Sequence, residues 1–242
     1  MEEPRFARTA ESTLFFQTAE LNLTDTSSRE CINCGLNRKV KEVKMLQLRK
    51  GSKVPFPEQL DEGYEIRDNM ITANISADKI EMVMAHFICM RDEPVFFILE
   101  LPFKQNEETE TGPGVVDAFH KHVYYIDGCT RDEALTILSR VGQLMINDGL
   151  CSFGFGGYES QEEIVFGKYN ITTIFSSDAD SFREFFKEHD IPEVSNLKTA
   201  WDTFSQEHPG SSEKIITNGK DVYSIPAAFA EWGLYEAETR ED

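Results

Sequence analysis

The sequence predicts an α+β protein with mainly antiparallel sheet(s) and three to four helices packed on them. Alternation of apolar and polar residues, which is typical of strands, recurs in many short segments. Clear amphipathic helical patterns are fewer, and strands do not alternate regularly with helices as a doubly wound parallel sheet requires. Hydrophobic residues make up 40% of the 242-residue chain, which is enough for a packed core.

No composition break divides the chain, so a single α+β domain over residues 1–242 is the preferred organisation. The acidic loop around Gly112 offers the alternative boundary. That alternative would separate a β-rich lobe at residues 1–112 from an α+β lobe at residues 113–242.

In the first part of the chain, strands are predicted at residues 12–18 and 40–48, and residues 65–75 have strand composition. Pro55 and Pro57 predict a loop between them. Residues 78–90 fit two patterns. A helix would place Ile80, Val83, Met84, Phe87 and Ile88 on one face, with Ser76 as cap. A strand is favoured, because a hairpin with the apolar strand at 95–101 would bury both runs.

The second part begins with a strand at residues 119–127 and the clearest helix at 130–149. Thr130 and Glu133 form a capping box there, and Gly149 can end the helix in the left-handed conformation. The remaining elements follow in order: strands at 151–157, 162–167 and 169–176, helices at 177–190 and 197–208, a hairpin turning at Asn218-Gly219, and a last helix from Pro226.

The formal net charge of −19 disfavours nucleic acid as a ligand, because phosphate binding needs lysine and arginine. A basic protein is the partner that this charge favours. Residues 36–53 are the exception, with seven basic residues and one acid, so this ribbon carries +6 and the remainder −25. Its alternating pattern predicts lysines on the solvent face of a strand.

Targeting signals are not recognisable in the sequence. Glu100 interrupts the strongest apolar run well short of the roughly 20 residues that a spanning helix needs. The first residues contain no apolar signal core. We therefore expect a cytoplasmic protein with no membrane partner, and five scattered cysteines argue against a disulfide framework.

Cys31 and Cys34 form a CxxC pair followed by glycine, a spacing that lets two thiolates converge on one zinc ion. The stretch CINCG resembles the knuckle of zinc-ribbon proteins over these five residues only. A structural zinc site needs a second pair of ligands. His120 and His122 would share one side of a strand, whereas His86 and Cys89 would share a face only on a helix.

The preferred function is a non-enzymatic, acidic binding protein, of the immunity or inhibitor kind, that neutralises a basic protein partner. No catalytic constellation stands out, and Cys151 lacks a signature that would make it a nucleophile. Two groups of acids are the candidate contacts: Glu107, Glu108, Glu110 and Asp117 in a loop, and an exposed group of Glu159, Glu162 and Glu163. The alternative is a metal-dependent hydrolase that uses His120, His122 and a carboxylate such as Asp117.

Overall fold

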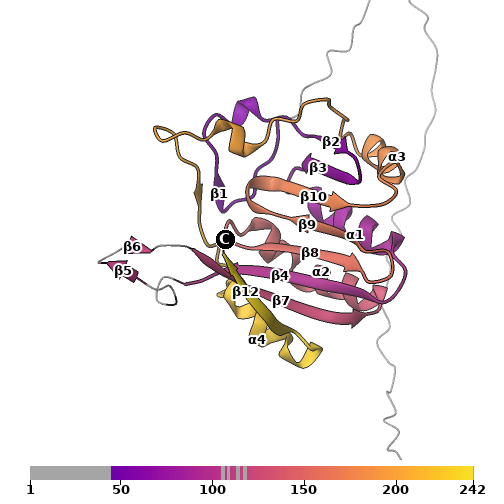
Figure 1. The fold of residues 1–242 in the computed structure, drawn as a ribbon, viewed down its shortest axis with the longest axis vertical. Coiled ribbons are helices and arrows are strands. Elements are labelled where there is room, and N and C mark those ends of the chain that lie inside the picture. The colour runs from indigo at the N-terminus through magenta and orange to yellow at the C-terminus, as the bar shows by residue number, and fades with distance from the viewer. Residues whose placement is uncertain (1–44, 105–106, 108–109, 113–114, 117–118, 242) are drawn as a thin grey trace, which may run out of the picture. The chain divides into compact units, whose positions relative to one another are not determined.

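The computed structural model describes the backbone of residues 45–104, 107, 110–112, 115–116 and 119–241. All of them belong to one compact unit that spans residues 42–242. Four α-helices accompany a mainly antiparallel sheet, which confirms the predicted α+β class (Figure 1). The strand predicted at residues 12–18 and the CxxC turn lie outside the described residues.

The main sheet has eight strands, and every neighbouring pair is antiparallel. Its spatial order is β12 (Tyr235–Glu241), β7 (His120–Cys129), β4 (Val95–Pro102), β8 (Ser152–Gly157), β9 (Glu162–Phe166), β10 (Ile171–Phe175), β3 (Met70–Asn74) and β2 (Gly63–Arg67). Two small pairs complete the strands: β1 (Ser52–Lys53) with β11 (Ser211–Ser212), and β5 (Glu110–Gly112) with β6 (Val115–Val116).

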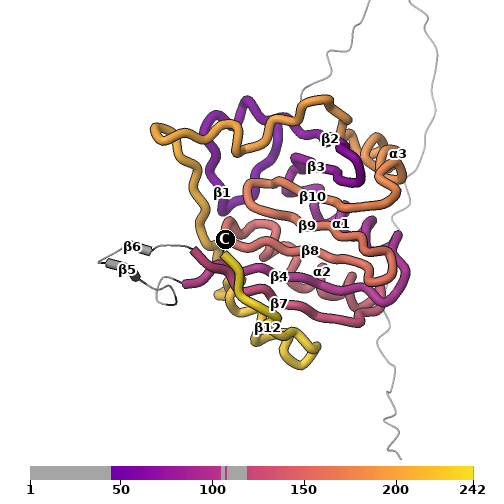
Figure 2. The backbone as a smooth tube through the Cα atoms, viewed as in Figure 1, coloured from indigo at the N-terminus to yellow at the C-terminus, as the bar shows by residue number. Residues whose placement is uncertain are grey.

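Early and late strands interleave in this sheet. β3 from the first part of the described chain lies beside β10, and β4 lies between β7 and β8, as the colours of Figure 2 show. Strands from both sides of residue 112 therefore share one hydrogen-bonded layer. The single-domain organisation of residues 1–242 stays a prediction, since residues 1–44 are not described.

Helices α1 (Ile80–Met90) and α2 (Arg131–Asn147) pack against each other and cover one face of the sheet (Figure 1). The short helix α3 (Ser181–Glu188) joins them through Phe182 and Phe186, and α4 (Ile225–Phe229) precedes β12. Five single-turn 3-10 helices lie in the connections, at Pro57–Gln59, Lys168–Asn170, Ala200–Thr203, Val222–Ser224 and Ala230–Trp232. The main core lies between the sheet and these helices.

The strand preferred for residues 78–90 is wrong, because these residues form α1. Val83 and Met84 are both buried, as are Phe87 and Ile88, and adjacent residues can share a buried side on a helix but not on a regular strand. The proposed hairpin partner is not available either, since β4 is a central strand already paired on both edges, with β7 and β8.

Helix α2 begins as predicted, with Thr130 and Glu133 forming a reciprocal capping box. Its end differs from the prediction, because Asp148 is extended and Gly149 does not adopt a positive φ. Instead, Gly149 permits a close backbone crossing. A Cβ atom there would lie 1.9 Å from the carbonyl oxygen of Gly51.

Lys50 and Lys53 of the basic ribbon are exposed, as expected of its lysines, but the strand predicted there is wrong for the described residues and Arg49 is buried. Residues 45–49 contain no strand beyond an isolated bridge from Met45 to Asp61, and Arg49 is 1% exposed. Its guanidinium donates to the carbonyls of Met145 (2.6 Å) and Ile146 (3.1 Å) in the last turn of α2. A buried arginine thus satisfies helix-end carbonyls that would otherwise lack partners.

The helix predicted at residues 197–208 is limited to the single turn at Ala200–Thr203. Thr199 and Asp202 cap that turn, but Phe204 is extended and packs its ring against Tyr169. The turn at Asn218-Gly219 is confirmed, with both residues at positive φ, although only one bridge, between Thr217 and Lys220, flanks it.

Candidate protein-binding surface on the open face of the sheet

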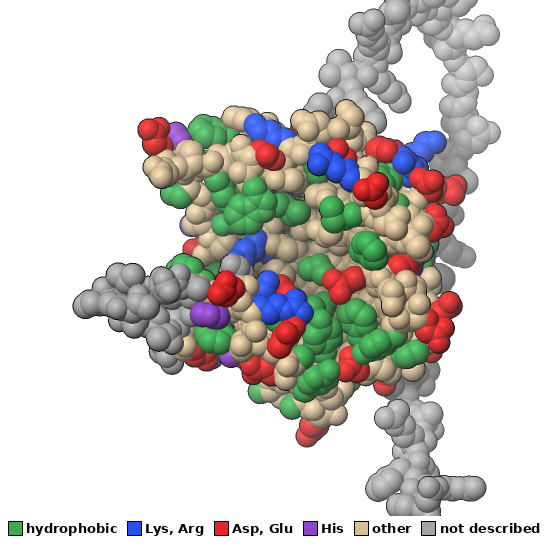
Figure 3. Space-filling view, viewed as in Figure 1, with side chains coloured by type: hydrophobic (Ala, Val, Ile, Leu, Met, Phe, Trp, Pro, Cys, Tyr) green, Lys and Arg blue, Asp and Glu red, His purple; other side chains and the backbone are tan. Residues whose placement is uncertain are grey.

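The two faces of the eight-stranded sheet have different surroundings. Alternate residues of each strand point to opposite faces, so Phe97 and Leu99 of β4 enter the core under the helices, whereas Phe96 and Ile98 point the other way. Neither α1 nor α2 covers that second side, which we call the open face. Figure 3 shows it, with hydrophobic side chains gathered among acidic ones.

The register aligns the open-face residues into rows that cross the strands. One row runs through Tyr125, Ile98, Gly154, Val165 and Thr173. Ile98 is only 5% exposed although it lies outside the main core cluster. The middle of this row, made of Ile98, Gly154 and Val165, forms an apolar floor on the face.

A second row contains large, exposed apolar residues. Phe96, Gly156, Glu163, Phe175 and Met70 are successive cross-strand neighbours. Phe175 is 50% exposed and Met70 is 42% exposed. The Phe96 ring lies over Gly156, where an added Cβ would meet the ring at 2.2 Å. Contiguous exposed apolar side chains of this kind mark interaction sites more often than isolated ones do.

An aromatic cluster with a central carboxylate borders this row. The rings of Phe96 and Tyr158 are 5.3 Å apart, and those of Phe96 and Tyr125 are 5.8 Å apart. Both Tyr158 and Tyr235 donate their hydroxyls to the Asp127 carboxylate, the latter at 2.6 Å. Burial and then the hydrogen bond to Asp127 raise the pKa of Tyr158, so its hydroxyl remains a donor at neutral pH.

Glu163 lies at the centre of the second row. Its side chain is half-buried and makes no hydrogen bond or ion pair with any other residue that the structure describes. Burial, and then the charge of Glu100, raise the pKa of Glu163, against a smaller opposing effect of Arg240. A partly desolvated carboxylate without a partner is unfavourable unless a cation approaches it.

The cations of the open face already have partners. Lys121 bonds to Glu100 at 3.0 Å, and Arg240 pairs with Glu238 and lies 3.9 Å from Glu100. These contacts neutralise the end of the face formed by β7 and β12. Arg240 is close enough to oppose the rise in the Glu163 pKa, but among the described residues Glu163, on β9, has no hydrogen bond or ion pair of its own.

Two of the three acids expected to form an exposed group, Glu159 and Glu163, remain candidates, because Glu159 is exposed in the β8–β9 turn. The expectation that Glu162 is exposed is wrong. Glu162 is 4% exposed, pairs with Arg91, and accepts hydrogen bonds from Ser176 and Ser177. Alternation along β9 turns it toward the helices, so it cannot contact a partner.

The acids of the predicted loop are only partly described. Glu107 accepts a hydrogen bond from the backbone N–H of Lys104 at 2.7 Å, which is the main reason its pKa is lowered. Glu110 begins β5, and nothing is described of its side chain. Glu108 and Asp117 lie outside the described residues, so their role as contacts stays a prediction.

The histidines of the predicted metal site lie on one side of β7, as expected. The His122 ring stacks on Phe103 at 4.2 Å, and its Nδ1 lies 2.8 Å from Glu236, with Nε2 3.6 Å from Glu107. Within the described part of the chain, no group of three or more His, Cys, Asp or Glu side chains is arranged to hold a metal ion. Cys31 and Cys34 lie outside that part, so the zinc site stays a prediction.

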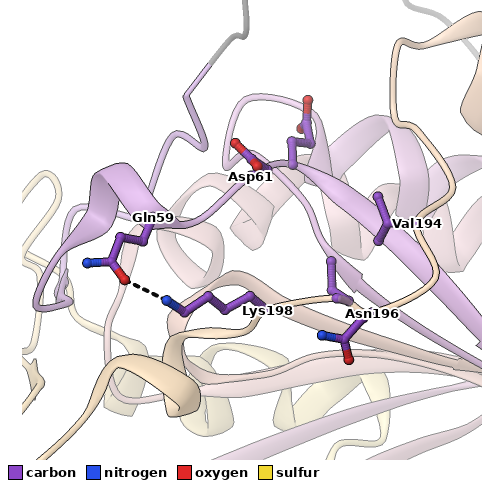
Figure 4. A pocket seen from close by; sticks show the side chains of 7 residues that line it. Gln59, Asp61, Val194, Asn196 and Lys198 are labelled. Carbon is purple, nitrogen blue, oxygen red and sulfur yellow. Dashed lines mark hydrogen bonds between the residues drawn. The ribbon is translucent and has the colours of Figure 1, made fainter.

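A small pocket lies at the opposite end of the fold from β12. Gln59, Asp61, Val194, Asn196 and Lys198 line it, and Lys198 bonds to Gln59 at 2.5 Å (Figure 4). It encloses about 90 Å³. Typical ligand pockets begin at roughly 300 Å³, so this one is too small for a metabolite.

Sequence reasoning missed most of the open-face residues. Phe96, Tyr125, Tyr158 and Phe175 carry no motif, and their proximity depends on the order of strands in the sheet. The available signal was the pair Gly154 and Gly156, which leaves most of β8 without side chains on this face.

In the described part of the chain, no helix has the length and apolar character needed to cross a lipid bilayer. Cys151 is buried, and burial raises its pKa to about 12, so the thiol is neutral at pH 7. Comparison of the chain with protein-family models, curated proteins and solved structures gave no match.

Proposed function

We propose that this chain is a non-enzymatic, acidic cytoplasmic binding protein that neutralises a basic protein partner through the open face of its sheet. One observation carries the proposal: Glu163 is a half-buried carboxylate without a partner among the described residues, and it lies in a row of exposed apolar side chains. Apolar area provides affinity, and an unpaired charge provides preference for an opposite charge.

The size of the uncovered face suits a protein partner. Six strands from β12 to β10 are separated by five spacings of about 4.8 Å, which gives a width of roughly 24 Å. A standard interface buries about 800 Å² on each partner, a patch roughly 28 Å across. The small pocket near Lys198, by contrast, offers no comparable area.

Affinity capture from a native lysate, followed by calorimetry with the identified and purified partner, tests the proposal. The open-face variant is the pair Glu163→Gln and Phe175→Ala. The matched control is the pair Glu58→Gln and Phe56→Ala, which changes an exposed acid and an exposed phenylalanine outside the main sheet.

We expect a basic protein that binds the wild type and the control equally, at least tenfold more weakly at 500 mM than at 50 mM NaCl, because salt screens charge attraction. The open-face pair should lose about tenfold or more in affinity. If partner binding changes neither with salt nor with the open-face substitutions, the proposal is refuted.

A further inference from the structure

The surroundings of Glu163 are specific enough to indicate which basic group of a partner would approach it. Cross-strand pairing places Phe175 directly beside Glu163 on one side and Gly156 on the other. Because Gly156 has no side chain, the Phe96 ring extends over it toward Glu163. The carboxylate on β9 therefore lies between the Phe175 ring on the adjacent β10 and the Phe96 ring, which extends across β8 from β4.

A guanidinium group matches this arrangement better than an ammonium group does. It is planar, stacks on aromatic faces and can bond a carboxylate through two parallel N–H donors. An ammonium group is more strongly hydrated, so it loses more on entering a partly desolvated position. The apolar floor of Ile98 and Val165 beside Glu163 increases that difference.

We propose that the open face seats an arginine side chain of the partner protein against Glu163, between the rings of Phe96 and Phe175. The inference rests on the proposed function and names the partner group that the site recognises. A second copy of the chain is a poorer occupant. A symmetric contact through this face would bring two chains of net charge −19 together, with both Glu163 carboxylates still lacking a cation.

The test uses the full chain, isotope-labelled, and three small probes: Nα-acetyl-arginine methylamide, the matching lysine compound, and the citrulline compound, which is a neutral isostere of arginine. NMR titration follows the side-chain signals of Phe96, Glu163 and Phe175. The variants are Glu163→Gln and the control Glu58→Gln. Far-UV circular dichroism and the urea midpoint verify that each variant is folded.

We expect the arginine probe to shift the three signals in a saturable way, and to bind at least threefold more tightly than the lysine probe. Citrulline should leave the signals in place. Glu163→Gln should weaken arginine binding about tenfold, because a charge-assisted contact is lost, and Glu58→Gln should not change it.

Three results would overturn the inference: equal binding of arginine and citrulline, equal binding of arginine and lysine, or arginine binding that Glu163→Gln leaves unchanged. These results are separable from failure of the proposed function. If a partner is captured and its binding depends on Glu163 and Phe175, but the probes show no preference for arginine, only the proposed arginine-binding position is rejected. If the arginine probe shifts the signals but the chain captures no basic protein, the arginine-binding position is retained and the proposed function is rejected.

Discussion

Arg49 provides a buried connection between the start of the described chain and the core. Besides the carbonyls of Met145 and Ile146, its guanidinium donates to those of Cys151 (3.2 Å) and Gly167 (3.0 Å). The guanidinium carbon, Cζ, lies 4.5 Å from the centre of the Phe166 ring. Among the described residues no carboxylate bonds to it directly, although the charge of the nearby Asp148 also favours the charged guanidinium. The positive charge is compensated by four carbonyl dipoles, including those at the negative end of α2.

We predict that Arg49→Ala lowers the free energy of unfolding by about 3–5 kcal/mol, because three buried carbonyls and one partly buried carbonyl lose their donor. Arg49→Lys should lose less, since an ammonium retains the charge but cannot reach all four oxygens. Urea unfolding measures both. The control is Arg67→Ala, whose exposed side chain pairs with Glu65 alone among the described residues and should change stability by less than about 0.5 kcal/mol. Equal losses for Arg49→Ala and Arg67→Ala would contradict this account.

His86 connects α1 to α3 as a neutral ring. It stacks on Phe185 with centroids 3.7 Å apart, and its Nε2 is buried without a hydrogen-bond partner among the described residues. Burial, and then the nearby His189 and Arg91, lower the pKa of His86, while Glu188 opposes them weakly. The folded chain therefore binds a proton at this ring less readily than the unfolded chain does.

This difference predicts that acid weakens the α1–α3 contact. Above the ordinary histidine pKa of about 6.5, both states are neutral and the stabilisation is complete. As pH falls below that value, the unfolded state gains a proton first, and the loss approaches about 1.4 kcal/mol per pH unit until the folded pKa is reached. His86→Phe keeps the stacking and should have a smaller stability loss between pH 7.5 and 5.0 in urea unfolding. The exposed His208→Gln serves as control, and a slope in His86→Phe equal to that of the wild type would exclude this role.

At the scale of the element, the sequence identifies a helix or strand well where only one pattern fits. It fails where the same residues fit both a helix and a strand. The capping box at Thr130 and Glu133 identifies α2 because its chemistry is local. The α1 segment is ambiguous because one set of apolar residues fits both periods, and the decision depends on which strand β4 pairs with. β12 is not predicted, because all seven of its residues are exposed and none marks a buried face. Its pairing with β7, and not burial of its side chains, holds it in the sheet.

The crossing of three segments at Gly51 and Gly149 is another element-level feature that depends on distant neighbours. Glu213 donates its N–H to the Gly51 carbonyl at 2.7 Å and accepts from the Gly149 N–H at 3.0 Å. The Gly51 N–H in turn donates to the last carbonyl of α2, that of Asn147, at 2.8 Å. Backbones can approach this closely only where no Cβ intervenes.

We predict that Gly149→Ala destabilises the chain by about 3 kcal/mol, because its Cβ would overlap the backbone of Gly51. Gly142→Ala is the matched control, since its Cβ would meet only the end of the flexible Leu138 side chain at 3.1 Å and α2 gains a better helix former. Thermal unfolding should separate the two variants by several degrees. A Gly149→Ala variant as stable as Gly142→Ala would show that the crossing relaxes freely.

At the scale of the whole molecule, the candidate site depends on the order of the strands. The sequence selects Glu163, but it assigns the buried Glu162 to the same exposed group, because it cannot tell which face of β9 points outward. Phe96 and Phe175 are 79 positions apart and meet Glu163 only because β4, β8, β9 and β10 are neighbours. Composition predicts that the molecule is acidic and globular, and the sheet order then decides where a carboxylate is left without a partner.

The excess of 43 acidic over 24 basic residues also has a consequence for the stability of the folded chain. Like charges lie closer together in the folded state than in the unfolded state, so their repulsion opposes folding. Salt shortens the screening length from roughly 20 Å at 20 mM to roughly 6 Å at 300 mM. Ion pairs such as that of Arg91 with Glu162 are buried and lose little by this screening.

We therefore predict that the melting temperature rises by roughly 2–4 °C from 20 to 300 mM NaCl at pH 7.5, equivalent to about 1 kcal/mol. Calorimetry of the full chain measures it. Replacing the exposed acids Glu58, Glu207 and Glu241 with glutamine changes the net charge from −19 to −16 and should reduce the increment. An equal increment in that variant would indicate a general effect of salt, whereas a melting temperature that falls with NaCl would mean that surface ion pairs outweigh the repulsion among carboxylates.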